Sequence, residues 1–460
     1  MQEIKKINLS LDWKTVELKS IADVTMGQSP KSEFYNDNFE GMPFLQGNKT
    51  FGDKYPSFEL YTTSIKKVAK KSSVLMSVRA PVGDLNIAKE DICIGRGVCG
   101  LQMKKGNNEF LYYLLKANIS HLINKESGTV FGSINKNDIE TFEVTLPEDS
   151  EDQMKILTIL KNIDKKIEVC RNLNKNLQKQ INILFKSFFI NFEFYDGKYQ
   201  KTLFGEIPIE WNIILFKDIL NERNEKSTNQ DIPMYSVTLD GIQPRADIYK
   251  KKITAKTTKF KIIHKYDLIF GMPNSGYQYG IMYDEIGGVS SAYPVFEING
   301  IQPRYVDLFI KNISNYFNDI VKSGSRMGQG IDKKVLLSKE IYVPLNEHLD
   351  KYYSIESKLL DLINHNLTEI NNLTKLRDTL LPKLMSGEID VSQINCDLKI
   401  IIRKIYIKSS KLFLWRYLSE NQNYIKNTKS NETLLKSRTI HKINKFFAKF
   451  NARYRYYRQQ

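Results

Sequence analysis

The stretch ILTILKNIDKKIEVCRNLNKNLQKQINILFKSF, residues 156–188, carries apolar side chains at alternating steps of four and three. This spacing keeps one narrow stripe of a helix apolar, with the heptad period of 3.5. One polar residue, Asn174, interrupts the stripe. A helix with so narrow an apolar stripe is marginal in water by itself. The sequence therefore predicts a long helix that packs along another helix.

A second stretch with the same spacing spans residues 352–384. Its stripe consists of Tyr352, Leu359, Ile363, Asn366, Ile370, Leu373, Arg377, Leu380 and Leu384. Pro382 falls in the final turn, where proline is expected to end or kink a helix. The simplest partner for each long helix is the other one.

The two asparagines indicate how the helices pair. If the helices are antiparallel with their ends aligned, Asn174 faces Asn366, and two facing amides can bond to each other and fix the register. A parallel pair would place Asn174 opposite Ile370 and leave an amide without a partner, at a cost of roughly 1–3 kcal/mol. We therefore predict an antiparallel coiled coil. The alternative is that both asparagines lie hydrated at the rim of the helix pair.

The sequence also contains an internal repeat. Trp13 and Trp211 open similar segments 198 residues apart, and SGTVFGSINKNDIETFEVTLP (127–147) parallels SGSRMGQGIDKKVLLSKEIYVP (323–344). Each of these blocks is followed by one of the long helices, whereas the segments between the landmarks differ. Such a duplication is typical of one architecture built twice, and we expect pseudo-two-fold symmetry with two different recognition surfaces.

The segments between the landmarks have mixed character. Residues 74–78, 98–103 and 267–270 are short apolar runs of the kind that form strands, and residues 110–117 have helical spacing. The predicted fold class is α+β, with two mixed α/β domains, each followed by a long helix. The predicted boundaries are 1–150 for the first domain, 151–192 for the first helix, 193–345 for the second domain, 346–390 for the second helix and 391–460 for a basic tail.

The positive charge is concentrated at the end of the chain. The formal charge is +16, but residues 396–460 hold 16 Lys and Arg against 3 Asp and Glu, a net of +13, which leaves +3 for the preceding 395 residues. DNA binding must therefore be argued from features other than the overall charge. For the tail, a clamp on the DNA backbone, a basic amphipathic surface helix and a poorly ordered extension remain open.

Composition excludes several classes of protein. The four cysteines include no CxxC pair and are too few for a disulfide framework, so we predict no metal site. The first residues lack the apolar core of a signal peptide, and no apolar run of about 18 residues could cross a membrane. A cytoplasmic protein without membrane contact is expected.

Several longer motifs carry a family resemblance. They are MGQSP (26–30), PFLQG (43–47), SVRAPVGDLNIA (77–88) and CIGRGVCGL (93–101) in the first half, DLIFGMPNSG (267–276) and GGVSSAYPVF (287–296) in the second, and the helix ends LFKSFF (184–189) and LLPKLMSGEIDVS (380–392). Over about residues 10–390, the chain resembles the DNA-specificity subunits of type I restriction-modification systems.

The resemblance implies a role and a set of partners. Such a subunit is not an enzyme: it reads a bipartite, asymmetric target in double-stranded DNA, one half with each recognition domain. It would bind two methyltransferase subunits through its helices, and two restriction subunits would join them. S-adenosylmethionine, ATP and Mg are expected in those partners, with no cofactor in this chain. Consistent with this, the sequence shows no methyltransferase tetrad and no phosphate-binding loop. The alternative is a coiled-coil protein-interaction scaffold without DNA readout.

Candidate DNA-binding residues are polar side chains on glycine-rich loops, since Arg, Lys, Asn and Gln match the hydrogen-bonding pattern of base edges. In the first domain they are Gln28, Ser29, Lys31, Gln46, Asn48, Lys49, Arg79 and Arg96. In the second they are Arg245, Asn274, Tyr277, Gln278, Arg326, Gln329 and Lys333. The glycines on both sides of Arg96 would let the backbone approach a phosphate. Two alternatives remain open: Arg79 and Arg96 form buried pairs with Asp84 or Asp91, and residues 323–330 form a plain turn in place of a phosphate nest.

Overall fold

The computed structural model describes residues 13–124, 133–227, 231–239, 241–245, 259–271, 277–322 and 330–391. Within them the chain divides into two compact units. The first holds the chain up to Leu173 and the segment from Asn364 onward, and the second holds residues Asn174–Ile363. Each unit thus combines one recognition domain with part of both long helices. The candidates Asn274, Arg326 and Gln329 and the basic tail lie outside the described residues.

Both predicted long helices are confirmed, as α4 (Ser150–Phe189) and α8 (Asn346–Met385). Each ends a few residues before its predicted boundary. Pro382 lies inside α8, which ends only three residues later. Gly387 follows in the left-handed region, with φ of +76°, the conformation that commonly closes a helix C-terminus.

In the first unit, the parts of α4 and α8 that belong to it run in opposite directions. Asp164 of α4 accepts a hydrogen bond from the Arg377 guanidinium of α8 (2.9 Å), and Lys166, further along α4, pairs with Glu369, earlier in α8 (3.1 Å). A small apolar cluster is formed here by Ile163, Ile167, Cys170, Ile370 and Leu373. The apolar stripe predicted for α4 is therefore buried in this unit, as expected.

In the second unit, the end of α4 packs against the start of α8 through aromatic rings. The ring centroids of Phe189 and Tyr352 are 5.0 Å apart, and those of Phe185 and Tyr352 are 6.0 Å apart. Further along this unit, the Asn174 amide donates to the carbonyl oxygen of Ile363 (3.4 Å).

Asn366 belongs to the first unit and is only 6% exposed. The alternative that both asparagines lie hydrated at the rim is therefore wrong for Asn366. The pairing of Asn174 with Asn366 stays a prediction.

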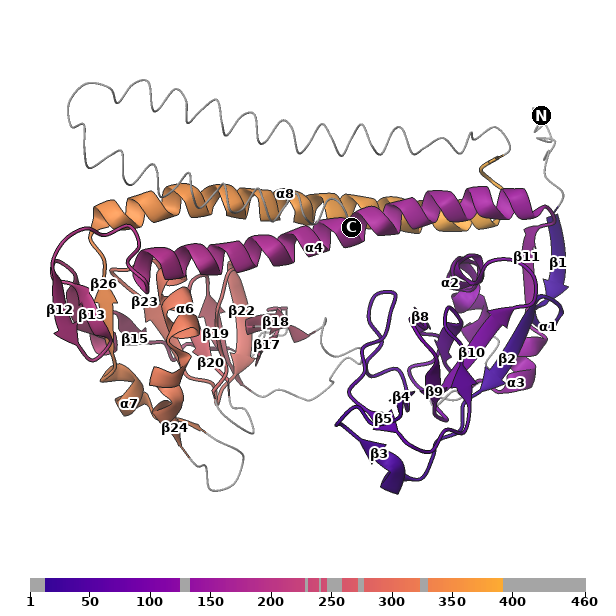
Figure 1. Ribbon diagram of the computed structural model, residues 1–460, viewed down its shortest axis with the longest axis horizontal. Coiled ribbons are helices and arrows are strands. Elements are labelled where there is room, and N and C mark those ends of the chain that lie inside the picture. The colour runs from indigo at the N-terminus through magenta and orange to yellow at the C-terminus, as the bar shows by residue number, and fades with distance from the viewer. Residues whose placement is uncertain are drawn as a thin grey trace. The chain divides into compact units, whose positions relative to one another are not determined.

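The first recognition domain contains three sheets (Figure 1). β1 (Trp13–Glu17) pairs with β11 (Glu143–Pro147). A four-stranded sheet has the order β2 (Ala22–Met26), β10 (Val98–Met103), β7 (Val74–Ser77), β8 (Leu85–Ile87). A five-stranded sheet has the order β3 (Tyr35–Asn36), β5 (Tyr61–Thr62), β4 (Met42–Leu45), β9 (Ile92–Ile94), β6 (Val68–Ala69). The helices are α1 (Leu18–Ile21), α2 (Asn108–Asn124) and α3 (Lys136–Glu140), and α2 lies between the four-stranded sheet and α4 (Figure 1).

The second recognition domain has its own sheets. β14 (Asn212–Leu215) pairs with β26 (Glu340–Val343), and a four-stranded sheet has the order β15 (Leu220–Glu222), β23 (Val295–Ile298), β20 (Leu268–Phe270), β21 (Tyr279–Ile281). A three-stranded sheet has the order β16 (Lys226–Ser227), β19 (Phe260–His264), β22 (Ile286–Ser290). Two-stranded pairs are β12 (Tyr199–Thr202) with β13 (Gly205–Pro208), β17 (Tyr235–Thr238) with β18 (Gly241–Pro244), and β24 (Val321–Lys322) with β25 (Gly330–Ile331).

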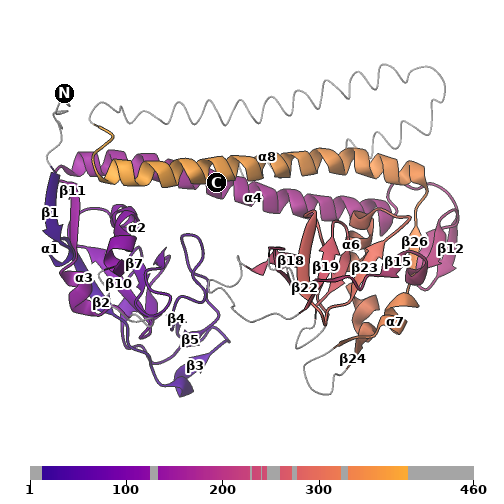
Figure 2. The ribbon, with the colours of Figure 1, turned by 180° about the vertical axis from the view of Figure 1, so that it is seen from behind.

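The helices of this domain are α6 (Pro303–Asn312) and α7 (Lys333–Leu337). Figure 2 shows α6 between the four-stranded sheet and the long helices. Asn312 of α6 bonds to Asn182 of α4 (2.9 Å), and Arg304 of α6 bonds to Glu356 of α8 (2.5 Å). Polar side chains therefore fix α6 to both long helices.

The two recognition domains repeat one strand order. β15-β23-β20-β21 corresponds in chain order to β2-β10-β7-β8, and the β14–β26 pair corresponds to β1–β11. α6 and α7 stand where α2 and α3 stand in the first domain. The duplication seen in the sequence is thus a duplication of topology, although the intervening loops differ.

Each domain contacts the end of one long helix through a tryptophan. In the first unit, a Cβ on Gly387, just after α8, would lie 2.8 Å from the Trp13 ring, so only glycine fits against that ring. In the second unit, the Trp211 ring lies 5.9 Å from the ring of Phe189, the last residue of α4. The same contact is thus built twice from equivalent parts of the repeat.

Candidate nucleic-acid interface

Three loops that are distant in sequence meet in the first recognition domain. The first loop follows β2, the second follows β4, and the third lies between β9 and β10. The backbone N–H of Arg96 donates to the hydroxyl of Ser29 (3.2 Å), and the N–H of Gly97 donates to the carbonyl of Gln46 (3.1 Å). The N–H of Gln28 also bonds to the backbone just before Arg96 (2.9 Å). Three groups of sequence-predicted candidates therefore lie together.

Glycines allow these loops to approach so closely. A Cβ on Gly27 would lie 2.1 Å from the carbonyl oxygen of Gly95, and one on Gly97 would lie 2.7 Å from that of Gln46. Real Cβ atoms do not come so near to backbone oxygens, so only glycine fits. These glycines thus allow the protein's own loops to pack closely, and the expected approach of a phosphate to the backbone beside Arg96 stays a prediction.

The candidate side chains of this domain point largely to solvent. Those classed as exposed are Gln28, Lys31, Gln46, Lys49, Arg79 and Arg96, and those half-buried are Ser29 and Asn48. The alternative of buried pairs for Arg79 and Arg96 is wrong, because both are exposed. Among the described residues no carboxylate forms an ion pair with either, and Asp91 instead bonds to Lys70 (2.9 Å). Lys31 and Lys49 form ion pairs with Glu33 (3.7 Å) and Glu59 (3.0 Å), and both pairs are exposed to solvent. These eight candidate side chains together form what we call the polar surface of the first domain.

Asn48 fastens the loop after β4 to the loop that carries Arg79. Its amide donates to the Asp84 carboxylate (2.5 Å) and to the Pro81 carbonyl (3.3 Å). The Ser77 hydroxyl bonds to the same carbonyl (2.8 Å). Asn48 therefore connects two loops of the domain. Sequence reasoning did not identify Ser77 and Asp84 as the residues that help to form this connection. An Asp seven residues after a Ser across a proline turn gives no pattern that would have revealed them.

The loop after β4 is also anchored to the helices of its own unit. Lys54 pairs with Glu109 at the start of α2 (3.3 Å), Glu109 also pairs with Lys161 of α4, and Asp53 pairs with Arg171 of α4. Burial raises the pKa of Glu109, but the bonds to Lys161 and Lys54 outweigh burial and lower this pKa overall. Ion pairs thus connect the polar surface to the long helix.

The candidates of the second domain are mostly engaged inside the protein. The Arg245 guanidinium donates to the Tyr235 carbonyl (3.2 Å), and the Tyr277 hydroxyl donates to the Ser314 carbonyl (2.9 Å). Burial raises the pKa of Tyr277 to about 12. Gln278 is half-buried, and Lys333 pairs with Glu222. Of these residues, only Lys333 combines a charge with substantial exposure, its side chain being 41% exposed.

Two further lysines near Lys333 were missed by sequence reasoning. Lys226 lies on β16, and Lys261 lies directly opposite it on β19. Lys261 is buried, with 5% of its surface exposed, and its ammonium donates to the Tyr293 carbonyl (2.9 Å). The sequence does contain a sign of Lys261, because this lysine stands among apolar residues in the strand FKIIH (260–264).

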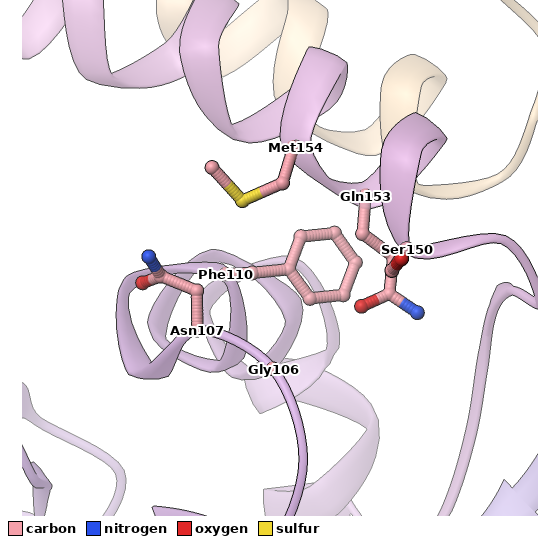
Figure 3. A pocket seen from close by; sticks show the side chains of 6 residues that line it. All are labelled: Gly106, Asn107, Phe110, Ser150, Gln153 and Met154. Atoms are coloured by element: carbon pink, nitrogen blue, oxygen red, sulfur yellow. The ribbon is translucent and has the colours of Figure 1, made fainter.

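Two cavities lie in the part of the chain that the structure describes. One, of about 240 Å³, lies where α2 and α4 begin and is lined by Gly106, Asn107, Phe110, Ser150, Gln153 and Met154 (Figure 3). None of these side chains can exchange a proton near neutral pH. A second, of about 590 Å³, contains Arg223, whose guanidinium is paired with Asp267 (2.9 Å) and Glu297 (3.4 Å).

The described part of the chain contains no group of His, Cys, Asp and Glu residues arranged to hold a metal. Among the helices that the structure describes, none is both long and apolar enough to cross a membrane.

Comparison with known sequences identifies relatives of one kind. Residues 10–179 match the model of the type I restriction modification DNA specificity domain. A protein proposed to be the MjaX specificity subunit of Methanocaldococcus jannaschii is 43% identical over 175 residues, which are 36% of this chain and 40% of that protein. The MjaIX specificity subunit of the same organism is 26% identical over 424 residues, covering 83% of this chain and 95% of that one. The HindI specificity subunit of Haemophilus influenzae is 22% identical and covers 82% and 100%.

Among solved structures, the S subunit of a type I restriction-modification system from M. genitalium is similar, with a TM-score of 0.45 and 18% identity. The match covers 84% of this chain and 99% of that one.

Proposed function

We propose that this chain, which belongs to the specificity subunits of type I restriction-modification systems, selects the DNA sequence that its partner subunits modify. One observation carries the proposal: two units repeat one strand order but present different residues on their loops. A bipartite, asymmetric target requires such an arrangement, with one frame used twice and two different surfaces. Each recognition domain would read one half of the target.

The first domain supports readout of DNA in particular. Its exposed side chains, which include Gln28, Gln46 and Arg96, are of the types that bond to base edges. They stand on loops that are held by backbone hydrogen bonds and close glycine contacts. Loops fixed in this way lose little conformational freedom on binding, which favours specific recognition.

The chemistry would lie in partner subunits. We infer a non-catalytic chain that joins two methyltransferase subunits through its long helices and two restriction subunits in the full complex. S-adenosylmethionine, ATP and Mg would be bound by those partners. The side chains that line the cavity at the starts of α2 and α4, none of which can exchange a proton near neutral pH, are consistent with that division of labour.

We further propose that α4 and α8 form an antiparallel coiled coil with pseudo-two-fold symmetry, with Asn174 and Asn366 fixing its register. The opposed direction of the helix segments within the first unit supports this pairing. The equivalent tryptophan contacts at the two helix ends support the symmetry. Such a coil would set the number of unread base pairs between the two halves of the target.

Lengthening both helices tests this spacing role. We expect that one extra heptad after Leu173 and one after Ile363 lengthens the coil by about 10 Å, at 1.5 Å per residue. The unread spacer should then grow by about three base pairs at 3.4 Å each. A whole heptad keeps the apolar stripe in phase, so folding should be retained. Mapping of methylated adenines measures the spacer, and an unchanged spacer in an active variant contradicts the spacing role.

The proposed function itself is tested by co-expression with the methyltransferase encoded beside it and genome-wide mapping of methylated adenines. We expect a split motif with two short defined blocks around a fixed gap. A stable complex that methylates no motif contradicts sequence selection by this chain. If no complex forms and the chain shows no salt-dependent binding to DNA, the scaffold alternative replaces the proposal.

A further inference from the structure

The repeated strand order identifies which loops of the second domain correspond to the polar surface of the first. After β2, the N–H of Gly27 donates to the Val98 carbonyl (3.0 Å); after β15, the N–H of Arg223 donates to the Val295 carbonyl (2.9 Å). Val98 and Val295 are the first residues of β10 and β23. The two backbone bonds are therefore equivalent.

Counting residues along the chain from these two bonds shows which positions of the two domains correspond. Asn224 stands where Gln28 stands in the first domain, one residue after the bonded N–H. Tyr293 stands where Arg96 stands, two residues before the strand that accepts the bond. Lys226, two residues beyond Asn224, belongs to the same loop and begins β16. The second domain thus has a surface equivalent to that of the first, built from other residues.

A lysine cluster occupies this equivalent surface and consists of Lys226, Lys261 and Lys333. Lys226 and Lys261 are direct cross-strand partners on β16 and β19, so they share one face of the sheet. Lys261 is fixed by its bond to the carbonyl of Tyr293, the residue equivalent to Arg96. Lys333 pairs with Glu222, the residue that ends β15.

Carboxylates neutralise the lysine cluster only in part. Within the described residues, the only ion pair of the cluster is that of Lys333 with Glu222, and no carboxylate pairs with Lys226 or Lys261. Burial lowers the pKa of Lys261, as do the charges of Lys333 and Lys226, and these effects outweigh the nearby Glu222 carboxylate, which raises it.

Neighbouring acids are engaged elsewhere: Glu225 bonds to His264 (2.8 Å), Glu297 to Arg223 (3.4 Å) and Asp332 to Lys322 (2.7 Å). Like charges directly opposite each other on neighbouring strands are destabilising. The cluster therefore costs folding stability in the free protein, and a bound anion would remove that cost.

We infer that the lysine cluster binds a phosphate of the DNA backbone and thereby positions the second recognition domain on its half of the target. The inference rests on the proposed function. Lys226 and Lys333, which are exposed or partly exposed, would contact the phosphate, and the buried Lys261 would add a fixed charge behind them. Because phosphate contacts position a protein without reading bases, this site would contribute affinity and not sequence preference.

The test compares the full chain, purified with its methyltransferase partner, with its K226Q/K333Q variant on a duplex that carries the mapped motif and on a scrambled duplex. Losing the contact to this one phosphate should reduce the slope of log affinity against log salt by about 0.9, and affinity at 0.1 M salt by about eightfold. Both duplexes should be affected alike. The K226R/K333R variant keeps the charges and should retain the wild-type slope.

Lys201→Gln is the matched control, because Lys201 is an exposed lysine of the same unit on the separate β12–β13 hairpin. If K226Q/K333Q leaves the salt slope of a motif-selective complex unchanged, this inference fails while the proposed function stands. If the wild type shows no motif selectivity, the proposed function fails and the inference with it. A calorimetric titration with inorganic phosphate is expected to show no binding at millimolar concentration, and binding that depends on Lys226 would assign the cluster to a free anion.

Discussion

Replacement of Gly27 by alanine is expected to abolish sequence-selective binding by the first recognition domain. The new Cβ would lie 2.1 Å from the carbonyl oxygen of Gly95 and 2.6 Å from that of Val98, and backbone atoms can yield only if the loops separate. Gln28 and Arg96 would then lose their common frame. We expect affinity for the motif to fall by at least about tenfold, or 1.4 kcal/mol, with non-selective binding retained. The measurement is affinity for motif and scrambled duplexes at one salt concentration.

Gly47→Ala is the matched control for this prediction. Gly47 lies on the same surface, between Gln46 and Asn48, but a Cβ there would meet no atom within 4 Å. This variant should therefore keep both affinity and motif. Equal losses in the two variants would mean that the close approach of the loops is not what matters, and an unaffected Gly27→Ala would contradict the rigid frame itself.

The Glu356→Gln variant is expected to lose about 3–5 kcal/mol of unfolding free energy in the second unit, the usual effect of breaking a buried ion pair. Glu356 is 2% exposed and accepts bonds from the Arg304 guanidinium (2.5 Å) and the Tyr352 hydroxyl (3.0 Å). Glutamine keeps the shape but leaves the half-buried Arg304 without a counter-charge. Urea unfolding followed by tryptophan fluorescence, in a Trp415→Phe background that leaves Trp13 and Trp211, measures the loss.

Two comparisons identify the cause of that loss. The double variant R304M/E356L removes both charges and should recover most of the stability, because apolar residues of similar size often replace a buried pair without loss. Glu225→Gln breaks the exposed pair with His264 and should change stability by less than about 1 kcal/mol. If the double variant is as unstable as Glu356→Gln, packing of the side chain and not charge is responsible.

The sequence predicted the elements whose signal is local. The strand at 98–103 and the strand at 74–78 appear as β10 and as β7, which ends one residue earlier. The helical spacing at 110–117 lies within α2. In each case the periodicity of apolar residues reflects burial against the same core, so a short window contains the information.

The candidate site was predicted in part for the same reason. Glycine-rich motifs selected the loops with Gln28, Gln46 and Arg96, and the structure brings these loops together, because their close backbone approach requires glycine. In the second domain, sequence reasoning selected Arg245 and Tyr277, whose side chains bond to backbone carbonyls of the same domain. Engagement of a side chain by a distant carbonyl leaves no trace in its neighbouring sequence.

By itself the sequence determined two long helices, the duplication and the motifs of one family, since these depend on spacing along the chain. Only the tertiary structure decided that each unit takes part of both helices, that three separate loops share one surface, and that Lys226 faces Lys261. These features arise from hydrogen bonds and packing between residues tens to hundreds of positions apart. Such contacts are selected by burial of the whole core, and no local pattern records them.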